Sequence, residues 1–453
     1  ANAHPHYLQG SVYGGGFIGS FGNNGPPVPY GSAEWPTDPG SANDRSVVTG
    51  NGLGGGAVRL DFTGTVRIDG EITANGDIGA YDSSSSGGSV LIVCQTIAGS
   101  GKVLAKPYDG TVNTTTVIGG GGGGGRIAVH YTPAYQEQVQ DCIVRFDASS
   151  GICHDPLRVA GIGAWVTFGA SENSEDNIAA MPPGTLWFPD NWPLTAASYR
   201  QNGWRFGGQW VSPVAIGALT FDAPLVLDAC NLYLPGSCSA FTANAGVAVK
   251  GTGLYARREF GLHLSNTTVT VNGDLNAEGA RFEIDGGSLT VNGDVNLTTN
   301  KWKDAKFNTA FAGGTVAVCA GPTNGTDAAY GASFIVSGGV NVSAASSVYL
   351  RCHPTDGAIP YMSAANVTVA AGGRISAESG GWGLKLGPGA GGAYEPGASY
   401  GGKGGGSDPK NAYGSMEQPI DPGSGGGNVY GGGFFNGGGV VRLDVAEKLT
   451  LNG

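Results

Sequence analysis

The sequence predicts an all-β protein, a right-handed parallel β-helix (β-solenoid) with glycine-rich coils and an inserted central lobe or a set of larger coils. Three observations support this class. Short runs alternate apolar and polar residues, sustained helix-type apolar patterns are absent, and sequence blocks recur at fixed offsets. One long domain is compatible with 453 residues, because each coil of a solenoid packs only on its neighbours.

The first strands are predicted in residues 57–61, 65–70 and 71–76. Each run places apolar side chains at every second position, and Gly or Asn follows the alternating pattern. Period-2 alternation is typical of a half-buried strand, so short strands of about five residues are expected here.

A 20-residue repeat predicts the length of a coil. Residues 269–276 (VTVNGDLN) recur as residues 289–296 (LTVNGDVN), and looser copies begin near residues 247, 334, 367 and 448. A parallel β-helix has coils of this length, which predicts roughly 18 stacked coils along the chain.

Stacked coils place equivalent side chains on top of one another. Asn272 is therefore expected under Asn292, with amide hydrogen bonds between them, and Asp274 near Asp294. The glycine between these residues in each coil is expected to form a corner with positive φ. These glycines are Gly273 and Gly293.

A larger repeat links the two ends of the sequence. Residues 30–41 (YGSAEWPTDPGS) return as 413–424 (YGSMEQPIDPGS), and the same offset of 383 aligns 54–61 (GGGAVRLD) with 437–444 (GGGVVRLD). Chance does not produce a gapless register of this kind. The repeat predicts either a head-to-tail homopolymer, in which solenoid ends dock on each other, or a tandem array. The assembly candidates are Tyr30, Asp38, Arg59, Tyr413, Asp421 and Arg442.

Four segments differ in texture. Residues 1–130 form a glycine-rich solenoid segment, and residues 131–260 form an aromatic-rich central segment or lobe. Residues 261–375 hold the regular coils, and residues 376–453 repeat the N-terminal motif.

Several of these motifs resemble a family of glycine-rich β-helix-like repeat proteins, found in very large secreted or surface proteins of Verrucomicrobia- and Lentisphaerae-like bacteria. The resemblance lies in residues 87–92 (GGSVLI), 398–405 (ASYGGKGG), the block that begins at Tyr413, residues 437–443, and the run 119–125 of seven glycines before Arg126-Ile-Ala-Val. It covers about half of the chain. It implies an extracellular repetitive scaffold and carries over no catalytic residues.

Composition restricts the classes of function. The chain has 84 Gly and 24 Pro, but 40% of its residues are hydrophobic, which is enough apolar surface for an ordered fold. Charged residues make up 13%, the net charge is −11, and the basic residues form no cluster, so a nucleic-acid partner is not expected. No apolar run has the length of a membrane helix. The glycine run fits no phosphate-binding loop and instead predicts close packing of backbones.

Carboxylates on successive coils are the candidates for metal binding or catalysis, because parallel β-helices are the usual scaffold of polysaccharide lyases and hydrolases. Asp274, Asp285 and Asp294 are expected to line one face, where they would hold a structural Ca²⁺ or flank a glycosidic bond. Turn chemistry alone also selects Asp beside Gly. No other cofactor is expected. His4 and His6 form a terminal His-Pro-His that either binds a metal or is an ordinary tail.

The central segment holds the best candidates for ligand binding. Four tryptophans lie within 24 residues, and exposed indoles stack on sugar rings, whereas buried ones fill a core. They are Trp187, Trp192, Trp204 and Trp210.

Cysteines and sequons bear on secretion. The cysteine pairs Cys142–Cys153, Cys230–Cys238 and Cys319–Cys352 are disulfide candidates, with Cys94 left over, and the alternative is that all seven cysteines are buried thiols. Six N-x-[ST] sequons are glycosylation candidates. They are Asn113, Asn266, Asn296, Asn324, Asn341 and Asn366.

These observations predict a secreted or cell-surface structural protein without enzymatic activity, whose partner is a further copy of itself and, in addition, surface glycans. The alternative is a carbohydrate-binding or polysaccharide-degrading β-helix protein that acts through the aromatic central segment. An adhesin that presents residues 131–260 to a receptor is compatible with the structural function.

Overall fold

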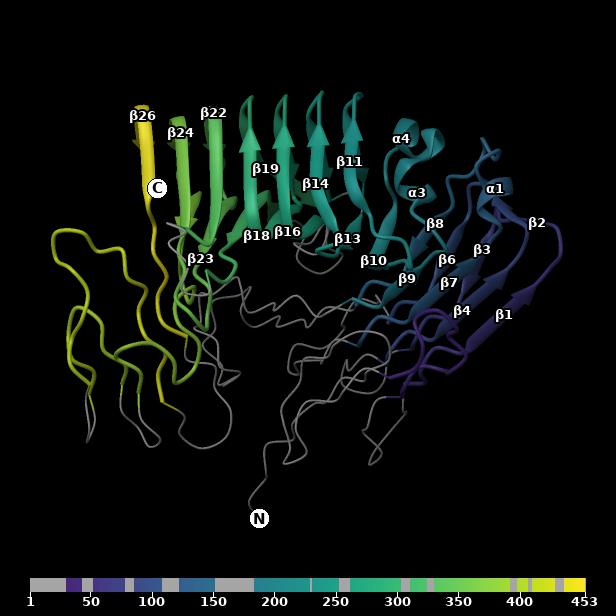
Figure 1. Ribbon diagram of the computed structural model, residues 1–453, viewed down its shortest axis with the longest axis horizontal. Coiled ribbons are helices and arrows are strands. Elements are labelled where there is room, and N and C mark those ends of the chain that lie inside the picture. The colour runs from purple at the N-terminus through teal and green to yellow at the C-terminus, as the bar shows by residue number, and fades with distance from the viewer. Residues whose placement is uncertain are drawn as a thin grey trace, which may run out of the picture. The chain divides into compact units, whose positions relative to one another are not determined.

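The computed structural model describes twelve stretches of the chain, which form two compact units. The stretches are residues 30–42, 52–77, 85–107, 122–150, 183–228, 230–251, 261–302, 310–323, 330–391, 397–405, 410–427 and 436–452. Unit 1 contains the described residues up to 150 together with 183–215 and 231–233, and unit 2 contains the described residues 216–228, 230 and 234–452. Most of their regular structure is parallel β-sheet, so the predicted all-β class is confirmed (Figure 1).

Unit 1 consists of short strands with three very short helices in its described residues. The strands are β1 (Ala57–Asp61), β2 (Thr65–Arg67), β3 (Glu71–Thr73), β4 (Ser89–Val93), β5 (Thr96–Ala98), β6 (Lys102–Leu104), β7 (Arg126–His130), β8 (Arg145–Asp147), β9 (Thr185–Trp187), β10 (Phe206–Val211) and the start of β13 (Asn231–Leu234). The helices are α1 (Pro133–Gln136), α3 (Trp192–Thr195) and α4 (Ala197–Asn202). The three strands predicted between residues 57 and 76 are confirmed as β1, β2 and β3.

These strands form three parallel ladders in unit 1. The first ladder runs β1, β4, β7, β9, β10. The second pairs β2 with β5, and the third runs β3, β6, β8, β10. The chain thus visits the first, second and third ladder in turn and returns to the first one strand further along.

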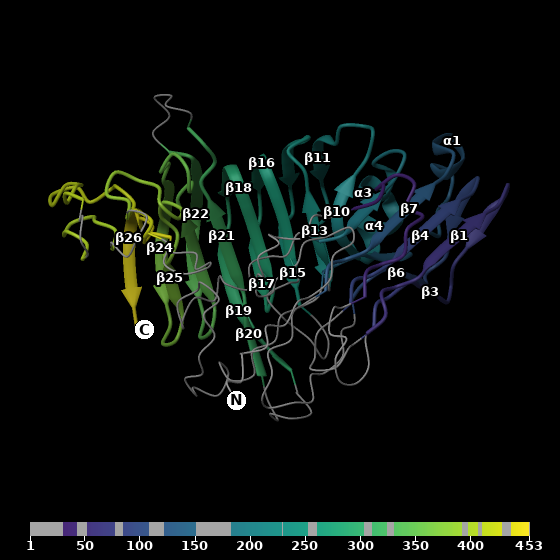
Figure 2. The same ribbon diagram turned by 90° about the horizontal axis from the view of Figure 1, so that it is seen from below.

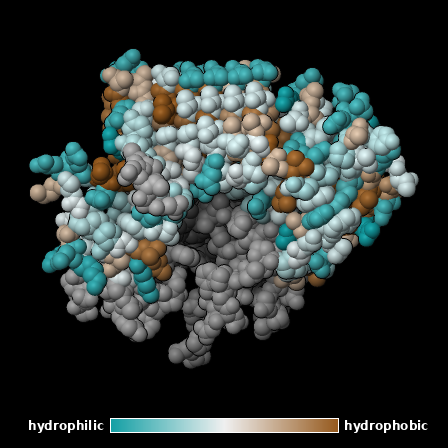
Figure 3. Space-filling model, in the orientation of Figure 1, coloured by the Kyte–Doolittle hydropathy of each residue, from teal (hydrophilic) through white to brown (hydrophobic). Residues whose placement is uncertain are grey.

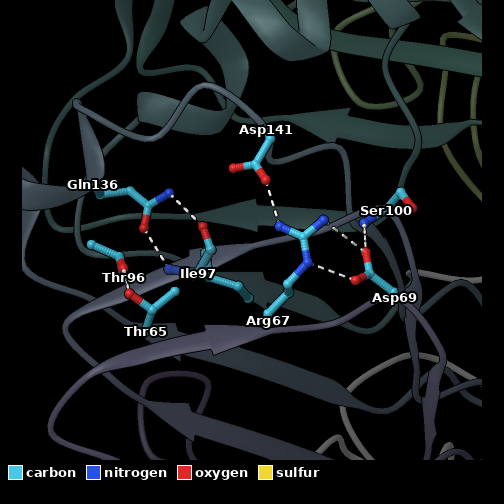
Figure 4. A network of polar contacts seen from close by, with 8 residues as sticks. All are labelled: Thr65, Arg67, Asp69, Thr96, Ile97, Ser100, Gln136 and Asp141. Carbon is cyan, nitrogen blue, oxygen red and sulfur yellow. Dashed lines mark hydrogen bonds and ion pairs between the residues drawn. The ribbon is translucent and has the colours of Figure 1, made fainter.

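A glutamine side chain ends the second ladder. Helix α1 follows β7, and its buried Gln136 amide takes the place of a third strand beside β5 (Figure 4). Its Oε1 accepts a hydrogen bond from the Ile97 N–H at 2.7 Å, and its Nε2 donates to the Ile97 carbonyl oxygen at 2.9 Å. One side chain therefore satisfies both backbone groups that a strand would have satisfied.

Consecutive glycines let the backbones of unit 1 approach closely. A Cβ on Gly88 would lie 2.0 Å from the Gly56 carbonyl oxygen, and one on Gly125 would lie 2.2 Å from that of Gly88. No side chain fits at such distances. The predicted close backbone packing is confirmed for Gly122, Gly124 and Gly125 in the described part of the glycine run.

Unit 2 contains longer strands, several of which bend through two ladders. They are β11 (Gly217–Phe221), β12 (Leu225–Asp228), β14 (Cys238–Ala243), β15 (Val247–Lys250), β16 (Gly261–Val271), β17 (Leu275–Glu278), β18 (Arg281–Val291), β19 (Val295–Trp302), β20 (Ala310–Gly313), β21 (Thr315–Cys319), β22 (Ala332–Val342), β23 (Ser347–Arg351), β24 (Pro360–Val369), β25 (Arg374–Ser376) and β26 (Leu443–Leu451). β20 pairs with β19 in antiparallel orientation.

The first ladder of unit 2 runs β11, β14, β16, β18, β22, β24, β26, with the strands side by side in Figure 1. The second ladder continues through β12, β15, β17, β19 and the later parts of β22, β24 and β26. The third contains the early parts of β16 and β18, then β21, β23 and β25.

The predicted 20-residue register is confirmed between β16 and β18. Val269 pairs with Leu289 and Val271 with Val291, and their side chains are fully buried. Alternate residues of each strand point inward, as period-2 alternation predicts, so apolar side chains stack along the ladders and form the core.

Asparagine side chains stack outside this core, as predicted. The Asn292 Nδ2 donates to the Asn272 Oδ1 at 2.8 Å, and the Asn272 Nδ2 donates to the Asn244 Oδ1 at 2.7 Å. Asp274 and Asp294 are also adjacent, because the Asp294 N–H donates to the Asp274 Oδ1 at 2.9 Å. A row of hydrophilic side chains crosses the ends of the unit 2 strands (Figure 3).

The prediction of a positive φ at two corner glycines was wrong. Gly273 and Gly293 are not among the glycines with positive φ. A Cβ on Gly293 would instead lie 2.4 Å from the Asp274 Oδ1, and one on Gly273 2.9 Å from the Gly246 N. Glycine is required because the turns of successive passes stack closely, not because the corner needs a left-handed backbone.

The 20-residue period does not hold for every pair of described strands. The described first ladders contain five strands in unit 1 and seven in unit 2. A 20-residue period holds from β16 to β18, but the next strand of the first ladder begins 32 residues after Ala57 and 59 residues after Arg126. Described strands between residues 131 and 260 belong to these ladders, and the boundary between the two units falls among them.

Candidate assembly site

The 383-residue repeat is a structural module. We define the N-terminal module as the described residues of 30–61 and the C-terminal module as those of 413–444. In the N-terminal module, the Tyr30 hydroxyl donates to the Pro39 carbonyl oxygen at 2.8 Å and is hydrogen-bonded to the Ser41 Oγ at 2.9 Å. These bonds fold residues 30–41 into a compact loop, with Gly31 at φ 78°.

The C-terminal module repeats this geometry. The Tyr413 hydroxyl donates to the Pro422 carbonyl oxygen at 2.6 Å and is hydrogen-bonded to the Ser424 Oγ at 2.8 Å, and Gly414 has a φ of 87°. Burial raises the pKa of Tyr413. The same sequence therefore forms the same local structure at positions 383 residues apart.

The glycine triplet that follows is also equivalent in the two modules. A Cβ on Gly54 would lie 1.9 Å from the Gly40 carbonyl oxygen, and one on Gly437 would lie 1.8 Å from that of Gly423. The Gly40 N–H donates to the Gly55 carbonyl oxygen at 2.7 Å, and the Gly423 N–H donates to that of Gly438 at 2.8 Å. Each loop is thus fastened to its own glycine strand.

The N-terminal module lies on the outer face of the first ladder of unit 1. The Arg126 guanidinium of β7 donates to the Tyr30 carbonyl oxygen from Nε at 3.1 Å and from Nη2 at 2.8 Å. The Ser89 Oγ of β4 donates to the Asp38 carbonyl oxygen. Asp38 thus contributes through its backbone, and strands β4 and β7 hold the loop in place.

An aromatic stack completes this contact. The exposed Trp35 ring lies 4.0 Å from the His130 ring, which lies 4.2 Å from the Trp187 ring, and both pairs are stacked. The His130 Nε2 is 2.8 Å from the Glu34 carbonyl oxygen, which accepts a hydrogen bond from it. No sequence pattern linked Trp35 to His130 and Trp187. The module is repeated in the sequence, but the strands β7 and β9, on which its N-terminal copy packs, are not.

The equivalent loop of the C-terminal module is more exposed. Pro36 is buried, whereas its equivalent Pro419 is exposed. Met416 is 100% exposed and Ile420 43% exposed. Among the described residues, the C-terminal module therefore lacks the covering that β4, β7 and β9 provide for the N-terminal one.

Of the two equivalent arginines, the one in the C-terminal module has the closer packing contacts. The Arg442 guanidinium lies 5.3 Å from the Tyr330 ring and 5.6 Å from the Tyr361 ring, and the two tyrosines are stacked. The equivalent Arg59 side chain is 58% exposed and forms an ion pair with Asp61 at 3.1 Å. Arg442 therefore packs on Tyr330 and on Tyr361 of β24, whereas Arg59 is mostly exposed.

The other predicted site residues do not form a common site. Trp204 and Trp210 are completely buried, Trp187 is 6% exposed, and Trp192 is partly exposed. The first two fill the core of unit 1 and cannot stack on a sugar ring, and the Trp210 Nε1 donates to Asn191 at 3.0 Å.

The three aspartates do not line one face. Asp274 and Asp294 lie in turns after the first ladder, and the Asp294 Oδ1 accepts a hydrogen bond from the Gly339 N–H at 2.7 Å. Asp285 belongs to the third ladder, opposite Cys319. In the described residues, no group of three or more His, Cys, Asp or Glu side chains is placed to hold a metal ion.

The six described cysteines are free thiols, and Cys153 lies outside the described residues. Cys319 pairs with Arg351 in register, so Cys352 is displaced by one residue and faces the opposite side of the sheet, which prevents a Cys319–Cys352 disulfide. Cys230 and Cys238 are not bonded to each other either. Burial raises the pKa of Cys238 and Cys352 to about 11 and that of Cys94 to about 12.

Four of the six sequon asparagines are described. Asn266 is exposed with a φ of 50°, whereas the Nδ2 atoms of Asn296, Asn341 and Asn366 donate hydrogen bonds to Asn276, Asn296 and Glu447. Asn113, Asn324, His4 and His6 lie outside the described residues.

The chain matches no family model, and no significant similarity was found to curated proteins or to solved structures. Within the described part, none of the helices has the length and apolar character needed to cross a membrane.

Proposed function

We propose that this chain is a non-catalytic structural unit of an extracellular fibre or matrix, and that its ladders follow a right-handed parallel β-helix whose units join end to end. The order of the ladders supports this path, because from β16 to β18 and from β17 to β19 of unit 2 the chain returns and adds a strand to the ladders in parallel register. Kinship with the glycine-rich repeat proteins of bacterial surfaces is part of the same proposal.

The observation that carries this proposal is the position of the repeated module. β1, in the N-terminal module, pairs only with β4, and β26, which begins in the C-terminal module, pairs only with β24 among the described strands. The two copies thus lie at strand edges, where a solenoid is either capped or extended.

The chemistry of the chain suits an exterior location. Cys238 and Cys352 are buried and their pKa is raised, so an oxidising medium does not readily modify these thiols. Surface glycans are a further partner under this proposal.

Immuno-electron microscopy of producing cells tests this function. Antibodies against the purified chain should label the cell exterior along fibres or a layer of uniform thickness. Labelling confined to the cell interior, or release of reducing ends from an acidic polysaccharide by the purified protein, would contradict it.

A carbohydrate-binding or polysaccharide-degrading role through the aromatic segment is the alternative proposal. Of the four candidate tryptophans, its binding surface would have to use Trp192, because Trp187, Trp204 and Trp210 are buried. Glycan-array binding that is lost in Trp192→Ala would favour this alternative.

A further inference from the structure

Among the described strands, each module has neighbours on one side only. β1 has its partner β4 on the following side, and β26 has its partner β24 on the preceding side (Figure 2). The N-terminal module therefore shows the strand that can follow the module, and the C-terminal module shows the strand that can precede it.

The equivalent glycines Gly55 and Gly438 differ in the atoms that lie beside them. A Cβ on Gly55 would lie 2.0 Å from the Ala74 carbonyl oxygen and 2.3 Å from the N atom of Gly88, which precedes β4. Its equivalent, Gly438, has no described atom within 4 Å of such a Cβ. Nothing in the described structure requires glycine at position 438, whereas a following strand like β4 would.

A second glycine gives the same result. A Cβ on Gly40 would lie 2.3 Å from the Gly87 carbonyl oxygen of the following pass. At the equivalent Gly423 the nearest atom is the Gly438 N of its own module, at 3.1 Å. The loop glycine is again explained in the N-terminal module by a neighbour that the C-terminal module lacks.

The next glycine shows the converse and serves as an internal check. A Cβ on Gly56 would meet nothing within 4 Å, but one on the equivalent Gly439 would lie 2.8 Å from the Gly380 carbonyl oxygen of the preceding pass. In each module, the glycine that faces a described neighbour is crowded, and the glycine on the side without a described neighbour is open.

We propose that residues 440–444 and the rest of β26 pair, along their free edge, with β4 and β5 of a second copy of this unit, in the register in which β1 pairs with β4 and β2 with β5. The offset of 383 then places Ser89 of that copy beside Val440, Leu91 beside Arg442 and Val93 beside Asp444. This inference rests on the proposed function, since it gives the register at which two units of the fibre join.

The docked copy supplies the missing cover of the C-terminal loop. Its Arg126 donates to the Tyr413 carbonyl oxygen, and its His130 donates to that of Glu417. Within one unit, the same two side chains donate to the equivalent carbonyl oxygens of Tyr30 and Glu34. The exposed leucines of β26 gain a neighbouring strand as well. These are Leu449 and Leu451, 47% and 62% exposed, and hydrophobic residues gather beside the β26 end of unit 2 (Figure 3).

The partner is a copy joined in tandem. In a separate molecule the edge of β4 is already occupied by β1. A copy whose residue 71 follows residue 453 has no module of its own, because position 453 is equivalent to position 70, and the C-terminal module takes that place.

A two-unit chain tests the joint. It consists of residues 1–453 followed directly by residues 71–453, and it is compared with the single chain by hydrogen exchange and mass spectrometry. We expect the β26 amides of the first copy to exchange at least about tenfold more slowly than in the single chain, because edge strands open locally. Equal exchange in both chains would overturn the proposal.

Substitution at position 438 provides the second measurement. Gly438→Val should leave the unfolding midpoint of the single chain unchanged and should abolish the slowed exchange of β26 in the two-unit chain. Gly401→Val, another glycine with no atom within 4 Å, is the matched control and should affect neither chain. An equal effect of Gly438→Val in both chains would contradict the joint.

The two proposals fail separately. Both measurements use purified protein and do not depend on location, so a protein found only inside cells would overturn the proposed function and leave the joint intact. Conversely, fibres on the cell surface together with unprotected β26 amides would overturn this register alone.

Discussion

Asp147 carries a negative charge in the interior of unit 1. Its side chain is 3% exposed and forms ion pairs with Arg145 at 2.8 Å and Lys106 at 3.8 Å, and the Ser149 Oγ donates to it at 2.6 Å. Burial alone would raise the pKa of this carboxyl, but the two cations and the Ser149 hydrogen bonds outweigh it and hold the pKa well below its usual range. Gly207 leaves space for this group, since a Cβ there would lie 2.2 Å from the Asp147 Oδ1.

Asp147→Asn should lower the free energy of unfolding by about 3 kcal/mol at pH 7, because the buried ion pairs of Arg145 and Lys106 with this carboxylate are lost. The lowered pKa means that the stabilisation by Asp147 is present above the unfolded-state pKa of about 4 and is lost as the pH falls toward the native value. Urea unfolding of both proteins should therefore show a penalty about 1 kcal/mol smaller at pH 3 than at pH 7. A pH-independent penalty would contradict the ion-pair role.

At the scale of the element, the stacked asparagines could be predicted from sequence, whereas the ends of ladders could not. Asn272 and Asn292 occupy the same position in two gapless repeats, so strand pairing alone determines that they stack. Gln136 shows the limit of such reasoning. It ends the second ladder by imitating a strand, and no periodicity marks it, because its role depends on where a helix packs in three dimensions.

A second row of stacked asparagines contains a sequon, so the contribution of its hydrogen bonds can be tested separately from glycosylation. The Asn296 Nδ2 donates to the Asn276 Oδ1 at 3.0 Å, and the Asn296 Oδ1 accepts from the Asn341 Nδ2 at 2.9 Å, while Asn296 and Thr298 belong to the same sequon. Asn296→Ala removes two hydrogen bonds and should cost about 2 kcal/mol in urea unfolding.

Thr298→Ala is the matched control, because it destroys the sequon and leaves the ladder in place. With protein expressed in a host that does not glycosylate, we expect its stability to be within about 0.5 kcal/mol of the parent. Equal losses in the two variants would show that the ladder does not stabilise the fold.

At the scale of the whole molecule, the sequence predicted the parallel all-β architecture and the repeated module but not the varying length of the passes. The prediction of roughly 18 coils took the 20-residue period of β16 and β18 as general, whereas paired residues of the first ladder lie 32 residues apart in β1 and β4 and 59 residues apart in β7 and β9. The predicted carbohydrate platform fails at Trp204 and Trp210 for a related reason, since composition does not report which side of a strand faces the core.

The charges of the module explain why separate chains are not expected to join through these edges. Consider a direct contact in which the C-terminal edge of one molecule pairs with β1 of another and each residue lies beside its equivalent 383 positions earlier. Arg442 would then lie beside Arg59, and Asp444 beside Asp61. Like charges on adjacent strands are destabilising by up to about 1 kcal/mol for each pair. In the tandem joint, the same residues meet Leu91 and Val93 instead.

Reversing one set of charges should therefore create a polymer. Arg442→Asp with Asp444→Arg in the single chain places opposite charges against Arg59 and Asp61 of the next molecule, and we expect head-to-tail association that weakens with salt, measured by analytical ultracentrifugation. Adding Arg59→Asp and Asp61→Arg restores like charges and should restore the monomer. A doubly substituted chain that stays monomeric, or association that persists after all four substitutions, would show that these charges do not control contact between the edges.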